Sequence, residues 1–188
     1  GVAPVGTGPA RPLMTAQQAP AARVATGDPG HRRVERAMGT MISLYLPEGG
    51  AAGPAADAAF AWFHGVDERF SPFRPNSEVG RLMRGELTLS DVSADLGEVL
   101  ETADAVEALS DGAFDIRGHR PDGRPDPTGV VKGWSVDRAA AILSAAGLGR
   151  FFLSAGGDVL VRGGQGPERA WRVGIAHPFQ QQAVALVL

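Results

Sequence analysis

Residues 91–110 carry the clearest periodic pattern in the sequence. Apolar side chains recur there at the spacing of one helix face, at Val92, Leu96, Val99, Leu100, Ala103, Val106 and Leu109. Ser90 or Asp91 is the candidate N-cap, and Gly112 is the candidate helix end. The pattern predicts a helix with one apolar face, so the chain must supply a second apolar layer for that helix to cover.

The rest of the chain supplies both helices and strands. Helical spacing recurs at residues 55–70 and again at residues 135–146, where Gly147 ends the pattern. Short apolar runs predict strands at residues 41–46, 151–153, 159–161, 171–176 and 183–188. Glycine pairs and a proline separate the later runs, which favours an antiparallel meander. The predicted fold class is α+β, a mixed or antiparallel sheet with packed helices.

One domain is expected, over residues 34–188. Residues 1–33 are predicted to be a disordered tail, because Pro, Ala and Gly dominate there and offer little apolar surface. The last apolar run stops at Leu188 with no polar residue after it. A strand left in that way exposes an edge or an unfinished core, so we expect the domain to be incomplete, with its C-terminal part missing.

Composition excludes several classes of function. The 188 residues carry 18 Lys and Arg against 21 Asp and Glu, a net charge of −3, which gives no general attraction to nucleic acid. There is no Cys, so disulfides and thiolate metal sites are excluded. No apolar run is long enough for a transmembrane segment, and no secretory signal is visible, which favours a cytoplasmic location.

Four segments carry residues suited to chemistry. They are residues 37–40, residues 70–82, residues 110–115, and residues 126–137 with the later 154–158. Gly129 and Gly133 flank Lys132 ahead of the predicted helix at 135–146, an arrangement that suits a phosphate because free N–H groups, the helix dipole and a cation favour an anion. Asp115 and Asp126 are acceptors for sugar hydroxyls or for the shell of a divalent metal. Each feature also has a plainer interpretation, as a turn glycine, a solvated lysine or a turn-forming aspartate.

Taken in order, the segments are similar to the pattern of a known family. They run M-G-T, F-S-x-aromatic with S-E-x-x-R-L, S-x-G-A-F-D, G-x-x-K-G-aromatic-x-V-D and G-G-D. From about Val34 to Pro178 the chain resembles the ApbE family, the FAD:protein FMN transferases. The resemblance implies an ApbE-like fold related to the T-fold. It also implies an enzyme that binds FAD and Mg²⁺, releases AMP, and joins FMN to a Thr or Ser hydroxyl of an acceptor flavoprotein.

The resemblance also implies a set of site residues, although no catalytic residue among them. The expected cofactor-binding positions are Met38, Phe73, Ala113, Phe114, Asp115, Asp126 and Lys132. Met38 and Phe73 would line the flavin end, residues 113–115 would form a loop against the FAD, and Lys132 would contact the cofactor. The main-chain oxygen of Gly129 is the expected metal ligand.

The same resemblance sets limits on the chain. The family's later metal-binding Asp and Thr would lie beyond Leu188, so the 188 residues alone are expected to be inactive or poorly folded. Two alternatives stay open: an FAD pyrophosphatase that gives FMN and AMP with water as acceptor, and a flavin-binding scaffold without catalysis.

Overall fold

The computed structural model describes residues 30–49, 53–118, 121–180 and 183–188. Its elements, in chain order, are β1 (His31–Ala37), β2 (Thr40–Leu46), α1 (Gly53–Phe70), α2 (Glu78–Met83), α3 (Ala94–Leu109), α4 (Thr128–Ala145), β3 (Phe151–Ala155), β4 (Asp158–Arg162), β5 (Gly174–Ala176) and β6 (Val184–Val187). The predicted α+β class is confirmed. No helix within the described ranges is long and apolar enough to cross a membrane.

The main sheet has four antiparallel strands in the order β1-β2-β3-β4. Ala37 pairs with Thr40 across the β1–β2 hairpin, and Ala155 pairs with Asp158 across the β3–β4 hairpin, so each connection is a two-residue turn. Ile42 on β2 pairs with Ala155 on β3. This register places both hairpin turns at the same end of the sheet.

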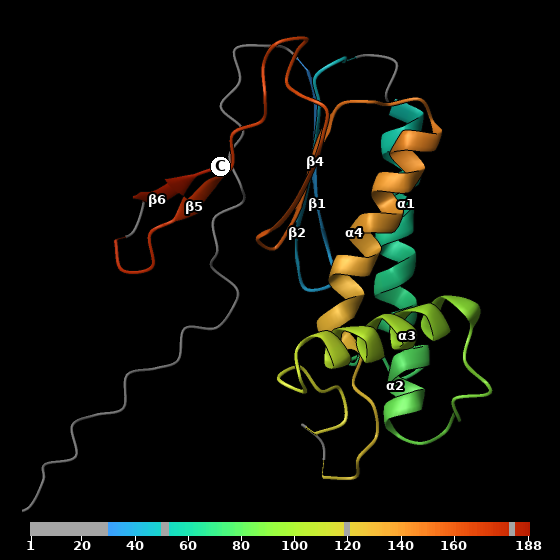
Figure 1. The fold of residues 1–188 in the computed structure, drawn as a ribbon. Helices are drawn as coiled ribbons and strands as arrows, with labels where there is room; N and C mark the ends of the chain where they lie inside the picture. The colour runs from blue at the N-terminus through green and yellow to red at the C-terminus, as the bar shows by residue number, and fades with distance from the viewer. Residues whose placement is uncertain (1–29, 50–52, 119–120, 181–182) are drawn as a thin grey trace, which may run out of the picture.

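Helices α1 and α4 run side by side along one face of this sheet (Figure 1). The apolar side chains of β2 and β3 that face them form the first core, with Ile42, Leu44, Leu46, Phe60, Phe63, Leu143, Phe151 and Leu153 among its buried members. All five residues of β3 are buried, because its other face is also covered, by a smaller cluster of Tyr45, Phe152 and Trp171. The sheet centre is therefore apolar on both sides, as expected for an inner strand.

A second core lies where α3 and α2 meet the C-terminal end of α1 and the N-terminal end of α4 (Figure 1). Its buried members include Val66, Phe70, Val79, Leu82, Leu96, Val99, Ile116, Val131 and Trp134. Met38, from the β1–β2 turn, packs against both cores. The turn thus lies at the junction between the sheet-based core and the helical one.

Two helix boundaries differ from the sequence prediction. Helix α3 takes Ser93 as its N-cap, with the hydroxyl accepting the Leu96 N–H at 3.3 Å, and neither Ser90 nor Asp91 has that role. Helix α4 begins at Thr128, well ahead of residue 135, so Gly129 and Lys132 lie inside the helix. Glycine disfavours a helix interior by only about 1 kcal/mol relative to alanine, which packing of the Val131 and Trp134 side chains readily offsets.

The strand predictions for residues 41–46, 151–153 and 159–161 are confirmed, but the later ones need correction. Among the described residues the meander ends at β4, because β5 and β6 pair with each other in a separate two-stranded sheet. The strand predicted over 171–176 is reduced to β5, since the Trp171 ring turns inward against Tyr45 and Phe152. Strand β1 and the short helix α2 were not predicted. Strand β1 begins at His31, three residues ahead of the domain start expected at Val34, and residues 1–29 of the predicted tail lie outside the described residues.

Candidate active site

The β1–β2 turn has an unusual occupant. Met38 and Gly39 both have positive φ, at 51° and 72°, as in the type I′ turns that suit two-residue hairpins. Such turns favour Asn, Asp or Gly, because a larger side chain is disfavoured in the left-handed region. The Met38 N–H donates to Asp67 Oδ1 on α1 at 2.9 Å. A side-chain carboxylate therefore satisfies the backbone group that this turn leaves outside the sheet.

The second hairpin turn packs directly against the first. The Gly156 N–H donates to the Met41 carbonyl at 3.2 Å. A Cβ placed on Gly156 would lie 2.5 Å from Thr40 Oγ1, so the Thr40 side chain rests against bare glycine backbone. The M-G-T and G-G-D segments, which are far apart in the chain, thus form one surface at this end of the sheet.

Helix α4 adds a cation to that surface. Lys132 Nζ lies 3.1 Å from Asp158 Oδ2, the first residue of β4. The Lys132 side chain is 35% exposed and that of Asp158 is 52% exposed, so the pair is open to solvent. On the same helix the Ser135 hydroxyl donates to the Lys132 carbonyl at 2.7 Å, and its oxygen lies 3.5 Å from Met38 Sδ. Lys132 is therefore placed beside both hairpin turns.

The S-x-G-A-F-D segment reaches the same helix through Phe114. A Cβ on Gly129 would lie 3.1 Å from Phe114 Cε2, so the aromatic ring covers the glycine in the first turn of α4. Ala113 is exposed beside it. Asp115 is partly buried and its Oδ1 accepts the Arg117 N–H at 2.7 Å. Glycine at 129 is thus explained by the close approach of the Phe114 ring.

Asp126 has a local structural partner. Its Oδ1 accepts the Thr128 N–H at 3.1 Å and the Thr128 hydroxyl at 2.6 Å. The Pro127 carbonyl accepts the N–H groups of Val130 and Val131 at 2.9 and 3.2 Å. These bonds occupy most of the N–H groups that begin α4, so within the described residues the start of this helix offers little free backbone to an anion.

Phe73 lies on the loop between α1 and α2, and its side chain is 92% exposed. The next residue, Arg74, binds Asp67 Oδ2 at 2.8 Å. Asp67 therefore links the Phe73 loop to the Met38 turn through its two oxygens. The structure brings Met38, Lys132 and Phe114 to one end of the sheet and holds the Phe73 loop beside them.

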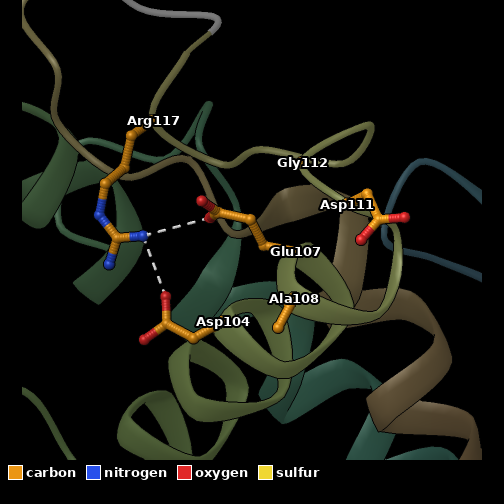
Figure 2. A pocket seen from close by; sticks show the side chains of 6 residues that line it. All are labelled: Asp104, Glu107, Ala108, Asp111, Gly112 and Arg117. Carbon is orange, nitrogen blue, oxygen red and sulfur yellow. Dashed lines mark hydrogen bonds and ion pairs between the residues drawn. The ribbon is translucent and has the colours of Figure 1, made fainter.

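A separate hollow of about 490 Å³ opens at the C-terminal end of α3 (Figure 2). It is lined by Asp104, Glu107, Ala108, Asp111, Gly112 and Arg117. The Arg117 guanidinium is already engaged by Asp104 at 2.9 Å and lies 3.7 Å from Glu107. Three carboxylates around one occupied cation disfavour a phosphate there. Neither Asp115 nor Lys132 lines this hollow.

The ApbE family profile matches residues 38–120 and 117–188, which together cover every described element after β1. The chain belongs to the ApbE family. That result confirms the resemblance drawn from the order of the motifs.

Relatives of known name agree with the ApbE assignment. A FAD:protein FMN transferase of Rhodobacter capsulatus is 30% identical over 127 residues, 68% of this chain and 21% of that protein. The chain thus spans about a fifth of the length of that relative. The flavin transferase ApbE of Vibrio cholerae superposes with a TM-score of 0.66 at 19% identity, over 80% of this chain and 65% of that one. The ApbE protein of Thermotoga maritima gives 0.70 at 17%, over 84% and 66%. These superpositions confirm an ApbE-like fold.

The residues that the structure describes offer few ligands for the Mg²⁺ ion expected from the resemblance. Gly129 lies in the first turn of α4, where its carbonyl oxygen is directed along the helix towards the N–H of Gly133. Within the described ranges no group of three or more His, Cys, Asp or Glu side chains is placed to hold a metal ion. Mg²⁺ prefers near-octahedral oxygen ligands, and these residues do not provide such a shell.

Several residues at this end of the sheet were not selected from the sequence. Thr40 and Asp158 stood within quoted motifs without an assigned role, and their position in those motifs was the available signal. Asp67, Arg74 and Ser135 had no distinguishing pattern. Their contacts depend on how α1, α4 and the turn pack together, which residue spacing does not reveal.

Proposed function

We propose that this ApbE chain is part of an enzyme that transfers FMN from FAD to a Thr or Ser hydroxyl of an acceptor flavoprotein, with release of AMP. The single observation that supports it most is the family match over residues 38–188, together with the name of the Rhodobacter relative. In such a reaction the acceptor oxygen forms a bond to the FMN phosphorus. The bond between the FMN phosphorus and the bridging oxygen of the pyrophosphate breaks, and AMP leaves with the bridging oxygen. The acceptor hydroxyl gives its proton to a base.

The proposed FAD site is the end of the sheet where the motifs meet. Met38 and Phe73 would contact the flavin, Ala113 to Asp115 would form the loop beside the cofactor, and Lys132 would face its phosphates. What supports Lys132 in that role is its charge, its partial exposure and its place beside two glycine-containing turns. Asp126 stays in the proposed set, although its present contacts are to Thr128.

The proposed role of Lys132 is to place a positive charge beside the phosphates of FAD. Phosphoryl transfer depends on positioning and on neutralising charge, more than on a covalent protein intermediate. Lys132 is paired with the Asp158 carboxylate, and a bound pyrophosphate would compete for the same ammonium group. Dependence on Mg²⁺ is a further part of the proposal. The Gly129 oxygen, the ligand expected from the resemblance, faces the Gly133 N–H inside α4, so the remaining metal ligands would have to come from outside the described residues.

The test uses the full-length protein with FAD, Mg²⁺ and a candidate acceptor, and follows FAD binding, AMP release and phosphoester-linked FMN. We expect Lys132→Gln to weaken FAD binding by roughly tenfold or more, the usual effect of losing a hydrogen bond to a charged group. Arg138→Gln is the matched control, since Arg138 lies on the same helix and pairs with Glu98. It should bind FAD as the wild type does.

Each outcome has a distinct meaning. FMN and AMP formed equally fast without acceptor would replace the transferase proposal by an FAD pyrophosphatase. Saturable FAD binding without either product would favour a flavin-binding scaffold. If the wild-type protein showed no saturable FAD binding in the presence of magnesium, the proposed function would be wrong.

A further inference from the structure

The β1–β2 turn holds Met38 in a conformation that its residue type does not favour. A left-handed conformation costs an L-residue with a β-carbon roughly 1–2 kcal/mol, and Asn, Asp or Gly would fit this turn better. A residue kept against its backbone preference often has a role for its side chain. The Met38 side chain is partly buried between both cores, and its sulfur lies 3.5 Å from Ser135 Oγ.

One carboxylate holds that turn from the outside. Asp67 lies near the end of α1, and its side chain is 22% exposed. Its Oδ1 accepts the Met38 N–H at 2.9 Å, and the geometry of a type I′ turn leaves that N–H without a partner in the sheet ladder. Hydrogen bonds from a backbone N–H to an ionised carboxylate are among the stronger ones in proteins.

The other oxygen of Asp67 reaches a second segment. Oδ2 binds Arg74 at 2.8 Å, and Arg74 immediately follows Phe73. The loop itself is ordered by the Ser77 hydroxyl, which donates to the Ser71 carbonyl at 2.5 Å and accepts the Gly80 N–H at 2.9 Å. Asp67 thus connects, through one residue, the two segments whose side chains are expected at the flavin end of the site.

We propose that Asp67 is a positioning residue for flavin binding, which fixes the backbone of Met38 and the loop of Phe73 so that both side chains face the isoalloxazine ring. This inference rests on the proposed function, because it assumes that FAD binds at this end of the sheet. Asp67 itself touches no substrate. Its effect is carried by the Met38 N–H and by Arg74.

Three variants of the full chain test the role of Asp67. Asp67→Ala removes both contacts, and Asp67→Asn keeps an oxygen that can accept the Met38 N–H. The matched control is Asp95→Ala, which breaks another Arg–Asp pair, the 2.8 Å contact between Arg69 on α1 and Asp95 on α3, without touching the Met38 turn. The ligands are FAD, FMN and ADP, with affinities measured by flavin fluorescence and by competition.

We expect Asp67→Ala to weaken FAD and FMN binding by about tenfold, the order expected when one charge-assisted hydrogen bond is lost. ADP binding should change less than twofold in that variant, because ADP lacks the flavin. Asp67→Asn should recover most of the FAD affinity. Asp95→Ala should leave all three affinities unchanged, even if its unfolding midpoint falls as much as that of Asp67→Ala.

The outcomes separate this inference from the function on which it rests. If the wild type binds FAD and Asp67→Ala weakens FAD and ADP equally, or binds as Asp95→Ala does, Asp67 has a structural role only and the inference is wrong. If Asp67→Asn is as impaired as Asp67→Ala, the Met38 N–H bond contributes nothing to flavin binding, and the role assigned to Asp67 in fixing the Met38 backbone is overturned. A wild type that binds no FAD would reject the proposed function itself.

Discussion

Gly156 lies so close to the Thr40 side chain that any larger residue at this position would collide with it. Its φ is +57°, and a Cβ there would lie 2.5 Å from Thr40 Oγ1. We expect Gly156→Ala to destabilise the protein by about 1–3 kcal/mol, from the left-handed backbone and the contact with Thr40 together. Urea unfolding of the purified protein measures this change.

Gly133 provides the contrast for that measurement. It lies inside α4, and a Cβ there would meet nothing within 4 Å. Gly133→Ala should therefore stabilise the protein by about 0.5–1 kcal/mol, because alanine loses less backbone entropy than glycine in a helix. Equal changes in the two variants would contradict the packing described for the hairpin turns.

The residues selected from the sequence were predictable to different degrees. Met38, Phe114 and Lys132 stand in short motifs whose order is characteristic of the family, and the structure places them at one end of the sheet. Asp67 was not predictable, because it lies 29 positions from its backbone partner and the contact arises from helix packing. The role of each residue toward FAD stays a prediction.

At the start of α4, Asp126 has two possible roles, one in binding the cofactor and one in stabilising the beginning of the helix. Asp126 was selected as a cofactor-binding residue, and in the structure its carboxylate bonds the N–H and hydroxyl of Thr128. Asp126→Ala should cost about 1 kcal/mol of stability, as for the loss of an N-terminal helix cap. Asp126→Asn should retain most of that stability. Thermal unfolding measures both.

The comparison of Asp126→Ala with Asp126→Asn also separates the two explanations. If Asp126 serves only the helix start, FAD affinity should follow stability in both variants. FAD binding lost in Asp126→Asn, at nearly unchanged stability, would instead support direct contact with the cofactor.

The elements that were missed have physical reasons. Strand β1 has the sequence HRRVERA, whose many charged side chains hide the alternation that usually indicates a strand. It is an edge strand with half-exposed side chains, so its sequence needs no apolar run. The predicted start of α4 was too late in the sequence, because Gly129 and Gly133 are residues that often interrupt a helix. The apolar contacts of Val131 and Trp134 nevertheless hold that stretch in the helix. The apolar runs at residues 171–176 and 183–188 predicted strands there, but such runs do not reveal that β5 and β6 pair with each other and not with β4.

For the molecule as a whole, one network joins the edge strand to the helical layer. Glu35 on β1 lies 2.6 Å from His64 Nε2 on α1 and 2.6 Å from the Arg33 guanidinium. These hydrogen bonds, that from His64 first, lower the pKa of Glu35 below its ordinary value. A carboxylate with a lowered pKa stabilises the fold at neutral pH, and this stabilisation is lost as the pH falls through the lowered pKa.

Glu35→Gln should therefore lower the unfolding free energy at pH 7 by about 0.5–1 kcal/mol, the range for a partly exposed ion pair. The difference from the wild type should persist down to about pH 4.3, the ordinary range of a glutamate, and vanish at lower pH, where both side chains are uncharged. Urea unfolding at several pH values measures it. The exposed Glu101 gives a control, and a Glu101→Gln variant with the same pH profile would contradict the assignment to Glu35.

Met38 packs against both hydrophobic cores from a turn only two residues long. Trp62 is shared between the two cores in the same way, so we expect the sheet half and the helical half to open together and not separately. Hydrogen exchange would register this as matched protection of amides in β2 and α3. A molecule that rests on the Met38 turn would then slow exchange in both halves at once, including amides far from any contact with it.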